Sequence, residues 1–420
     1  MEKEAQNNIT KITKTSCILF LFAGIFYLYE FFVRTSMGTI EPFVRSSINV
    51  NAQDIATISS AFSVGYVVMQ IPVGIIFDKF KLKTCGFFAI ITVALGCLIF
   101  SLSSGVFSAS LGRFIMGVGA AFALLMMLKI SVTYFPPKIA GGMTGLTSVF
   151  GIIGPVLAGG PLAYYLVVTE NNWTLLFKLL AILGMVFAIT FYFVSNSTKQ
   201  EKKTNSLPPL NIKQALKQKN IWGIAVFGFF IYPSIELFGS LYGSNHLSSI
   251  GYKYTTSTTI VSFVWLGMGL STPIIGFISD YFRNRKIILC GAAVVGVASS
   301  IMILFGPDYG AAHYMILYFL LGSAAGTQAI VFAVVADTVP RKHLGISMAL
   351  VNMSIILGVV FIQMTSGTIL HNMVDNQDTN PTSFFYSVFD YQVALLLSPI
   401  FFGAAFITGV IFIKNKKQGI

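Results

Sequence analysis

The sequence predicts an all-α membrane protein, with twelve transmembrane helices in two pseudo-symmetric six-helix bundles. Hydrophobic residues make up 55% of the 420 residues and charged residues only 10%, whereas soluble domains average roughly 25% charged residues. Apolar runs recur along the whole chain, and each has the roughly 20 residues needed to cross a hydrocarbon core. The same pattern of Gly, Pro and charged residues also occurs twice, about 203 residues apart.

Hydropathy, together with the positions of Gly, Pro and charged residues, predicts the helices in order. Lys11 and Lys14 precede the first apolar run, but no small-residue cleavage site follows, so we expect a retained helix and not a signal peptide. The expected spans are 15–39, 52–77, 84–104, 108–134, 139–167, 172–196, 220–243, 255–279, 286–305, 311–336, 342–370 and 389–413.

A polar, lysine-rich segment separates the two sets of six spans. It contains Pro208 and Pro209 and is typical of a linker. We therefore expect an N-terminal bundle over 1–197, a cytoplasmic linker over 198–219 and a C-terminal bundle over 220–420. No Gly-rich phosphate-binding loop with a Lys is present, so uphill transport would depend on an ion gradient.

The distribution of Lys and Arg predicts the orientation. Placing both termini in the cytoplasm puts 21 of the 27 basic residues in inside segments, whereas outside loops keep only Arg45 and Lys253. The expected location is a bacterial inner membrane. The net charge of +12 follows from these short clusters, so no nucleic-acid partner is expected. The Cys and His residues are not spaced as metal ligands or as a catalytic nucleophile and base, so we expect no metal site, no cofactor and no enzyme activity.

The repeated pattern has specific features. GIIFDKFKLK contains Gly74 and Asp78, and GFISDYFRNRK contains Gly276 and Asp280 at the equivalent place. Each motif is followed by basic residues, which include Lys83 and Arg285 respectively. Repeated membrane halves are typical of transporters that bind their substrate near the midplane between the halves.

These two motifs, with LGRFIMGVGAAF, resemble the loop and fourth-helix signatures of the major facilitator superfamily over essentially the whole chain. The resemblance implies alternating access, a monomer, and a conformational latch formed by Gly74, Asp78, Lys83, Gly276, Asp280 and Arg285. The alternative is that these are ordinary interfacial charges. The sequence departs from the pattern at Lys81 and Arg283, where the family has Gly. The Gly pair of GIIGPVLAGG is displaced by one residue from the drug-antiporter motif, which argues against drug export.

Four charged residues within the spans are candidate ligands, because a charge at the bilayer centre costs at least about 2.5–3.5 kcal/mol. Glu30 and Arg34 lie four residues apart, on one helix face, and we expect them to pair when the site is empty. A purely structural pair is the alternative. Arg113 is the third charge, although a side chain that reaches the membrane surface would also explain it. Glu236, after Pro233, is expected at about the depth of Glu30.

Arg34 also resembles the carboxylate-binding Arg of organic-anion and proton symporters in the family. The acids that often accompany it are replaced by Val33 and Ala120, which puts their proton pathway in doubt. Tyr29 and Tyr232 are equivalent in the repeat and complete the predicted binding site. Other polar residues that could line the cavity are Tyr66, Gln70, Gln328, Asn352 and Gln363.

The sequence favours a secondary active transporter for a small carboxylate-bearing nutrient, coupled to an ion such as a proton. Two cations and two acids suit an amino acid, and the chain is similar to the proteobacterial intraphagosomal amino-acid transporters. The alternative is a sugar acid or other organic anion carried with a proton, with the acids as couplers. Hypotheses of another class are a drug or siderophore exporter and a transporter-like sensor.

Overall fold

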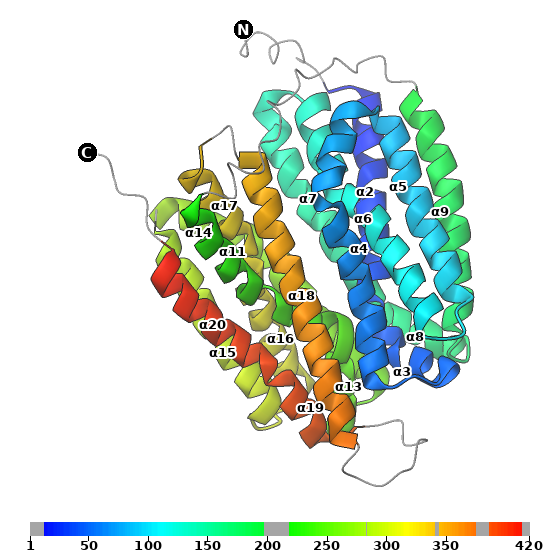
Figure 1. The fold of residues 1–420 in the computed structure, drawn as a ribbon, viewed down its shortest axis with the longest axis vertical. Coiled ribbons are helices and arrows are strands. Elements are labelled where there is room, and N and C mark those ends of the chain that lie inside the picture. Colours follow the sequence, from blue (N-terminus) through cyan, green and yellow to red (C-terminus); the bar gives the residue numbers. More distant parts are fainter. Residues whose placement is uncertain (1–11, 197–217, 283, 341–343, 375–385, 414–420) are drawn as a thin grey trace.

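The structure is a computed structural model that describes residues 12–196, 218–282, 284–340, 344–374 and 386–413. In these ranges all regular elements are helices, and twelve helical segments are long and apolar enough to cross a membrane (Figure 1). Arg283 lies outside the described residues, and so does the predicted linker except for its last two positions, 218 and 219. The helices of the first bundle are α2 (Lys14–Thr35), α3 (Met37–Ile48), α4 (Ala52–Lys79), α5 (Leu82–Ser101), α6 (Val106–Tyr134), α7 (Pro137–Ala158), α8 (Gly160–Val168) and α9 (Trp173–Asn196).

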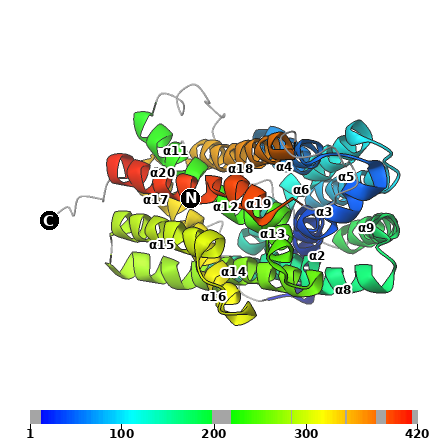
Figure 2. The same cartoon turned by 90° about the horizontal axis from the view of Figure 1, so that it is seen from below.

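The second bundle begins with α11 (Lys219–Ile231), α12 (Pro233–Leu237), a π-helical turn (Phe238–Tyr242) and α13 (Gly243–Ile250). It continues with α14 (Tyr254–Phe282), α15 (Arg285–Phe305), α16 (Ala311–Gly326), α17 (Gln328–Thr338), α18 (Leu344–Val374), α19 (Val388–Leu395) and α20 (Leu397–Phe412). Seen from below, the two bundles lie side by side, with α4 of the first next to α18 of the second (Figure 2).

Several spans that the sequence predicts as single helices are broken. The first ends at Thr35, and after Ser36 the chain continues as α3, which was not expected. The span predicted over 220–243 divides at Pro233, whose ring removes a backbone donor and is tolerated at the first residue of a helix. A π-helical turn follows it, and α13 extends the segment to Ile250. α3 therefore lies between two spans, whereas α13 is the last part of the span Ile221–Ile250.

Side-chain caps set the start of several helices, two of which begin spans next to the α3 end. Asn51 Oδ1 accepts from the backbone N–H of Asp54 at 2.9 Å, and Asp54 Oδ2 accepts from the N–H of Asn51 at 3.1 Å. Ser387 and Asp390 make the same reciprocal cap at the start of α19. Each cap satisfies backbone donors that a helix start leaves free. Both therefore fix where a span begins.

The two bundles repeat the same helix contacts. In the first, α2 packs on α7, α4 and α5 pack on α6, and α5 packs on α9. In the second, α11 packs on α18, α14 and α15 pack on α16, and α15 packs on α20. Each contact of the first bundle therefore has its counterpart in the second.

One close helix crossing shows how far the repeat extends. A side-chain carbon at Gly117 of α6 would lie 1.9 Å from Phe62 O of α4. In the second bundle, a carbon at Gly322 of α16 would lie 1.8 Å from Val264 O of α14. Only a residue without a side chain permits this approach, as is common where membrane helices pack closely.

Among the described residues, the bundles are in close contact at one end, and the space beside two glycines at the other end is open. We call the end that carries α3 and α13 the α3 end, and the end where α2 begins and α20 ends the terminal end. At the α3 end, a side-chain carbon at Gly38 would lie 2.9 Å from the Ser240 backbone of the other bundle. At the terminal end, a carbon at Gly74 or Gly276 would meet no atom within 4 Å. The structure is therefore closed at the α3 end.

Candidate functional site

Arg34 forms an ion pair between the two bundles. It lies on α2, with its side chain 7% exposed, and its Nη2 is 2.6 Å from Oε1 of Glu236 on α12. The N–H direction does not complete a hydrogen bond, so the contact is an ion pair by distance. The expected pair between Glu30 and Arg34 is not formed, which corrects the sequence prediction.

Arg34 pairs with Glu236 because the second bundle brings this acid against α2. Glu30 and Arg34 share a face of α2, as predicted, but the break after Ile231 places Glu236 directly opposite Arg34. Glu30 is 1% exposed, and its Oε2 has no hydrogen-bond partner among the described residues. The site therefore contains one paired acid and one acid with a free oxygen.

Glu236 is held by two hydroxyl groups of its own segment. Tyr232 donates to Oε1 at 3.0 Å, and Ser240 donates to Oε2 at 2.7 Å. These residues lie four positions before and after Glu236, so each reaches the carboxylate along one helical face. Tyr232 was predicted as a site residue. Ser240 was missed, although its spacing from Glu236 was a usable signal.

Arg113 acts on the backbone of α2. From α6, its Nη1 donates to Val33 O at 2.7 Å and its Nη2 donates to Arg34 O at 3.1 Å. These carbonyls belong to the last turn of α2, where helix carbonyls lack partners within the helix and favour a cation. The guanidinium also lies 4.9 Å from the centre of the Phe62 ring. Arg113 therefore fixes the segment that carries Arg34 and lies next to the ion pair.

Tyr29 is not brought to this cluster. Its hydroxyl donates to Leu180 O at 3.0 Å and lies 3.5 Å from Cys97 Sγ, inside the first bundle. One residue along a helix turns the side chain by about 100°, so Tyr29 cannot share the face of Glu30 and Arg34. Tyr29 and Tyr232 therefore occupy equivalent positions in the repeat, but only Tyr232 contacts the ion pair.

Aromatic rings and amides surround the ion pair. The guanidinium carbon of Arg34 lies 5.5 Å from the centre of the Phe31 ring and 5.7 Å from that of Tyr66. Phe31 in turn contacts Trp265 of the other bundle edge to face at 6.3 Å. Asn352 Nδ2 donates to Gln70 Oε1 at 2.9 Å, which links α18 to α4. Both bundles thus supply groups around Arg34.

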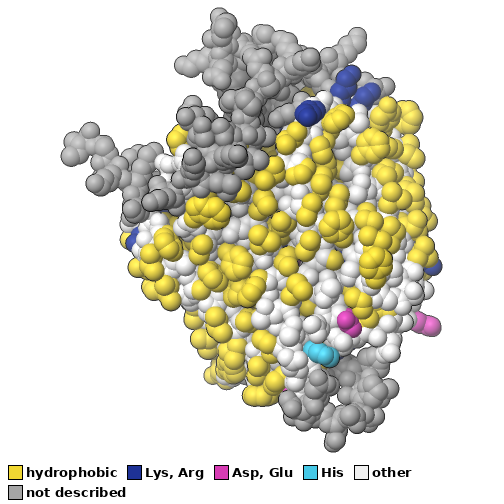
Figure 3. All heavy atoms as spheres, in the orientation of Figure 1, with side chains coloured by type: hydrophobic (Ala, Val, Ile, Leu, Met, Phe, Trp, Pro, Cys, Tyr) yellow, Lys and Arg dark blue, Asp and Glu magenta, His cyan; other side chains and the backbone are white. Residues whose placement is uncertain are grey.

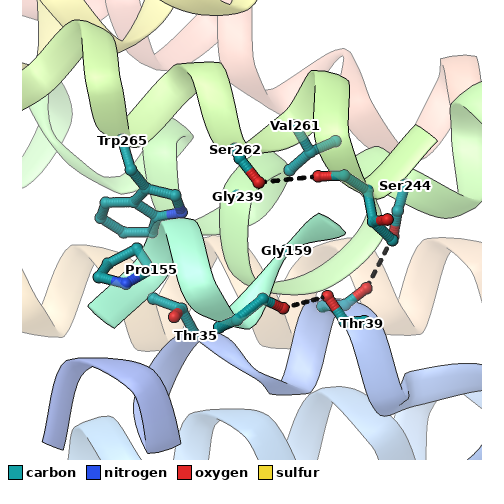
Figure 4. Close-up of a pocket in the computed structure, with 12 residues that line it drawn as sticks. Thr35, Thr39, Pro155, Gly159, Gly239, Ser244, Val261, Ser262 and Trp265 are labelled. Carbon is teal, nitrogen blue, oxygen red and sulfur yellow. Dashed lines mark hydrogen bonds between the residues drawn. The ribbon is translucent and has the colours of Figure 1, made fainter. Parts of the chain in front are cut away.

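Toward the α3 end the site is shut by direct contact. Ser244 of α13 donates to Gly38 O at 2.7 Å, and Thr39 donates to Ala158 O at 2.6 Å (Figure 4). The cavity between these groups has a volume of about 10 Å³, room for one water. The close-up shows Trp265 and Pro155 lying against one another at its edge. A substrate cannot pass at this end in the observed state.

A charged cluster reinforces this closure. Asn245 Nδ2 donates to Glu41 Oε2 at 2.5 Å across the bundles, and Arg45 Nε lies 3.2 Å from Glu41 Oε1. Arg45 also lies over the Tyr386 ring at 5.1 Å. Burial lowers the pKa of the Arg45 guanidinium, but Glu41 and nearby tyrosines together more than offset this, so the pKa is raised and Arg45 stays charged. Sequence reasoning had left Arg45 in an outside loop and missed Glu41.

The predicted latch residues lie at the terminal end. Arg285 lies 3.2 Å from Asp280 and 2.6 Å from Asp337, so these contacts stay within the second bundle. Lys83 lies over the Tyr192 ring at 5.1 Å. The side chain of Asp78 is outside the described residues. The latch remains a prediction, and in this state the Arg285 contacts do not join the two bundles.

Comparison with known proteins decides the family. The profile of the Major Facilitator Superfamily matches residues 19–258 and 237–419. The chain belongs to the major facilitator superfamily. It is a transporter and not an enzyme, and its twelve apolar helices make it a multi-pass protein of the inner-membrane type.

Similar proteins support the same architecture. The chain is 25% identical to the hexuronate transporter of Bacillus subtilis, over 79% of this chain and 82% of that one. It is 22% identical to the hexuronate transporter of Escherichia coli K12, over 87% and 89%. It also resembles the crystal structure of a bacterial homologue of the human lysosomal transporter Spinster in an inward-facing and occupied conformation. That match has 14% identity, a TM-score of 0.76, and coverage of 96% and 97%.

Proposed function

We propose that this chain takes up a sugar acid of the hexuronate class together with a proton, with Arg34 as the ligand of the substrate carboxylate. The observation that carries the proposal is a buried Arg at the bundle interface whose ion partner is a carboxylate of the opposite bundle. The relatives named as hexuronate transporters support the organic-anion alternative. The relatives named as hexuronate and galacturonate transporters do not support the amino-acid substrate that the sequence had favoured.

Arg34 has the chemistry that a sugar acid needs. A guanidinium offers a planar fork that binds a carboxylate through two parallel hydrogen bonds. In the observed state the carboxylate of Glu236 lies against this guanidinium, with Oε1 2.6 Å from Nη2. The substrate carboxylate would take its place, so binding would exchange a contact between bundles for a contact with the substrate. Tyr66, Gln70 and Asn352 lie nearby and supply polar groups suited to sugar hydroxyls.

Charge balance gives the reason for proton coupling. Arg34 and Arg113 carry two positive charges, which Glu30 and Glu236 balance when both are ionised. A bound sugar acid adds one negative charge, and an uncompensated charge at this depth is costly. One proton per substrate restores neutrality. We assign it to Glu30, because Glu236 has two hydroxyl donors and Glu30 Oε2 has none among the described residues.

Counterflow in proteoliposomes tests the substrate. The purified protein should exchange radiolabelled glucuronate or galacturonate and should not exchange amino acids. Arg34→Lys keeps the charge but loses the fork, so it should weaken substrate binding at least tenfold, and Arg34→Ala should abolish exchange. Tyr29→Phe is the matched control, because Tyr29 contacts Leu180 and Cys97 instead of the site.

Two outcomes would contradict the proposal. Exchange of amino acids without exchange of hexuronates would restore the amino-acid hypothesis. The double change Arg34→Gln with Glu236→Gln removes both members of the pair and should fold without transporting. Near-normal uptake by that double variant would show that the Arg34–Glu236 pair has only a structural role.

A further inference from the structure

A groove runs between α4 and α5 on the outer face of the first bundle. Both helices pack along α6 but hardly contact one another, so α6 forms the floor of the groove. Figures 1 and 2 agree that α4 and α5 lie toward the same outer face, with α6 behind them. A cavity of about 340 Å³ occupies the groove. This volume lies within the range of small-molecule sites, about 300–1,000 Å³.

The groove is apolar and lies at membrane depth. Its walls include Met69 and Ile76 of α4, Phe88 and Thr92 of α5, and Val118 and Phe122 of α6, all within spanning segments. The hydroxyl of Thr92 donates to Phe88 O at 2.7 Å, so it is satisfied by the backbone and not turned to an occupant. Walls of this kind gain dispersion contacts when hydrocarbon fills the space. In a bilayer, that hydrocarbon is a lipid acyl chain.

Lysines lie at the end of this groove. Lys79 and Lys81 flank Phe80, which lines the cavity, at the connection between α4 and α5. Both are exposed, and neither ammonium group forms an ion pair among the described residues. Lys129 also reaches this place, because its ammonium donates to Phe77 O near the end of α4. Figure 3 shows Lys and Arg side chains gathered along this edge, next to a hydrophobic face.

We infer that the groove binds an anionic phospholipid, with one acyl chain between α4 and α5 and the headgroup phosphate on Lys79 and Lys81. Basic residues beside an apolar pocket at a membrane surface suit an anionic headgroup. The bound lipid would hold the α4–α5 connection, which contains the repeated loop motif. The site is separate from Arg34 and does not depend on which substrate is carried.

Native mass spectrometry of the full-length protein tests this site. The protein is purified in detergent and mixed with phosphatidylglycerol or with phosphatidylcholine of the same acyl chains. We expect severalfold more retained phosphatidylglycerol. Soluble glycerol phosphate, which offers the headgroup without a chain, should not be retained.

Two kinds of variant locate the bound lipid. Thr92→Trp fills the groove, and the double change Lys79→Ala with Lys81→Ala removes the headgroup ligands; each should lower retained phosphatidylglycerol severalfold. Leu183→Trp adds the same side chain at a position of α9 that is 59% exposed, and Lys178→Ala removes a charge from α9; both should leave retention unchanged.

Two results would overturn the inference. Equal retention of the two lipids would remove the role of the lysines. If neither the groove variant nor the lysine variant lowers the amount of retained phosphatidylglycerol, the lipid binds elsewhere on the protein. Because the two lysines are exposed, their replacement tests the site even if Thr92→Trp fails to fold.

Discussion

Arg34 and its two acids concentrate the chemistry of the site in three side chains. The Arg34–Glu236 contact joins the bundles, while Glu30 stands one turn away with a free oxygen. Breaking a buried ion pair by removing one partner is strongly destabilising, because the other charge is left alone. The two acids are therefore not equivalent, and replacing each should have a different effect.

Neutralising either acid should uncouple transport, but only one should change affinity. Glu236→Gln removes the internal competitor for Arg34, so sugar-acid binding should tighten severalfold. Glu30→Gln should leave binding near its original strength. In both variants exchange should continue while accumulation driven by a pH gradient is lost, as measured by counterflow and by uptake in the same vesicles. Retained accumulation in Glu30→Gln would show that the proton is carried elsewhere.

Arg113 should matter for stability more than for binding. Arg113→Ala removes a donor from both the Val33 and Arg34 carbonyls; Val33 O keeps its hydrogen bond from Ser36 Oγ, whereas Arg34 O loses its side-chain donor, and an unsatisfied buried group costs about 1–3 kcal/mol. We expect a lower melting temperature in detergent, measured by fluorescence. The double change Arg34→Gln with Glu236→Gln should lower it less, because it leaves these backbone contacts in place and strands no buried charge. A melting temperature of Arg113→Ala equal to that of the native chain would make this backbone role wrong.

The sequence was sufficient to find Arg34, Arg113, Glu30 and Glu236, because ionisable residues inside membrane helices are rare and need a reason. It was not sufficient to pair them. Helical spacing shows only which neighbours share a face of one helix, and this favoured Glu30 as the partner of Arg34. Glu236 lies 202 positions further along the chain, so its approach depends on how the bundles meet.

At the scale of elements, the α3 end is closed by short pieces that hydropathy did not separate from the long spans. α3 and the segment from Phe238 to Ile250 contain polar residues whose role appears only when the bundles meet. The twelve spans were predicted because long apolar runs are a strong signal. The breaks at Ser36 and Gly159 were not, because composition does not show where a membrane helix bends.

The Glu41 cluster should control the closure of this end. Asn245→Ala removes a hydrogen bond to a carboxylate, about 1.5–3 kcal/mol, which corresponds to a shift of about tenfold or more toward the open state. Arg45→Ala should act in the same direction. Spin labels at Ser46 and Lys253, both exposed at the α3 end, should report longer distances in a cysteine-free background.

Lys178→Ala, at an exposed position of α9, serves as the control and should leave the distance between these two labels unchanged. A distance distribution in Asn245→Ala identical to that of the native chain would show that apolar packing alone holds the α3 end. In that case the charges would be surface features of α3 and not part of the closure.

For the whole molecule, the observed state is packed at the α3 end, whereas at the terminal end the described residues leave open space beside Gly74 and Gly276. Among the described residues, contacts that cross between the bundles include Arg34–Glu236, Gln70–Asn352 and the groups of the α3 end. Alternating access requires the reverse packing in the other state, with the terminal end closed. Which end faces the cytoplasm stays a prediction from the Lys and Arg distribution.

The terminal-end acids should therefore affect rate and not stability. The side chain of Asp280 is 72% exposed in the observed state, and its contact with Arg285 stays within one bundle. Exposed pairs of this kind contribute about 0–1 kcal/mol, so Asp280→Asn should leave the melting temperature unchanged. When the terminal end closes, this acid would meet the other bundle, and its loss should slow turnover severalfold with little change in substrate affinity.

The control is Asp308→Asn. Asp308 is an exposed acid at the α3 end that accepts a hydrogen bond from Tyr252 at 2.6 Å, and its replacement should not slow turnover. Loss of substrate binding by folded Asp280→Asn would instead assign Asp280 to the site and end the latch hypothesis.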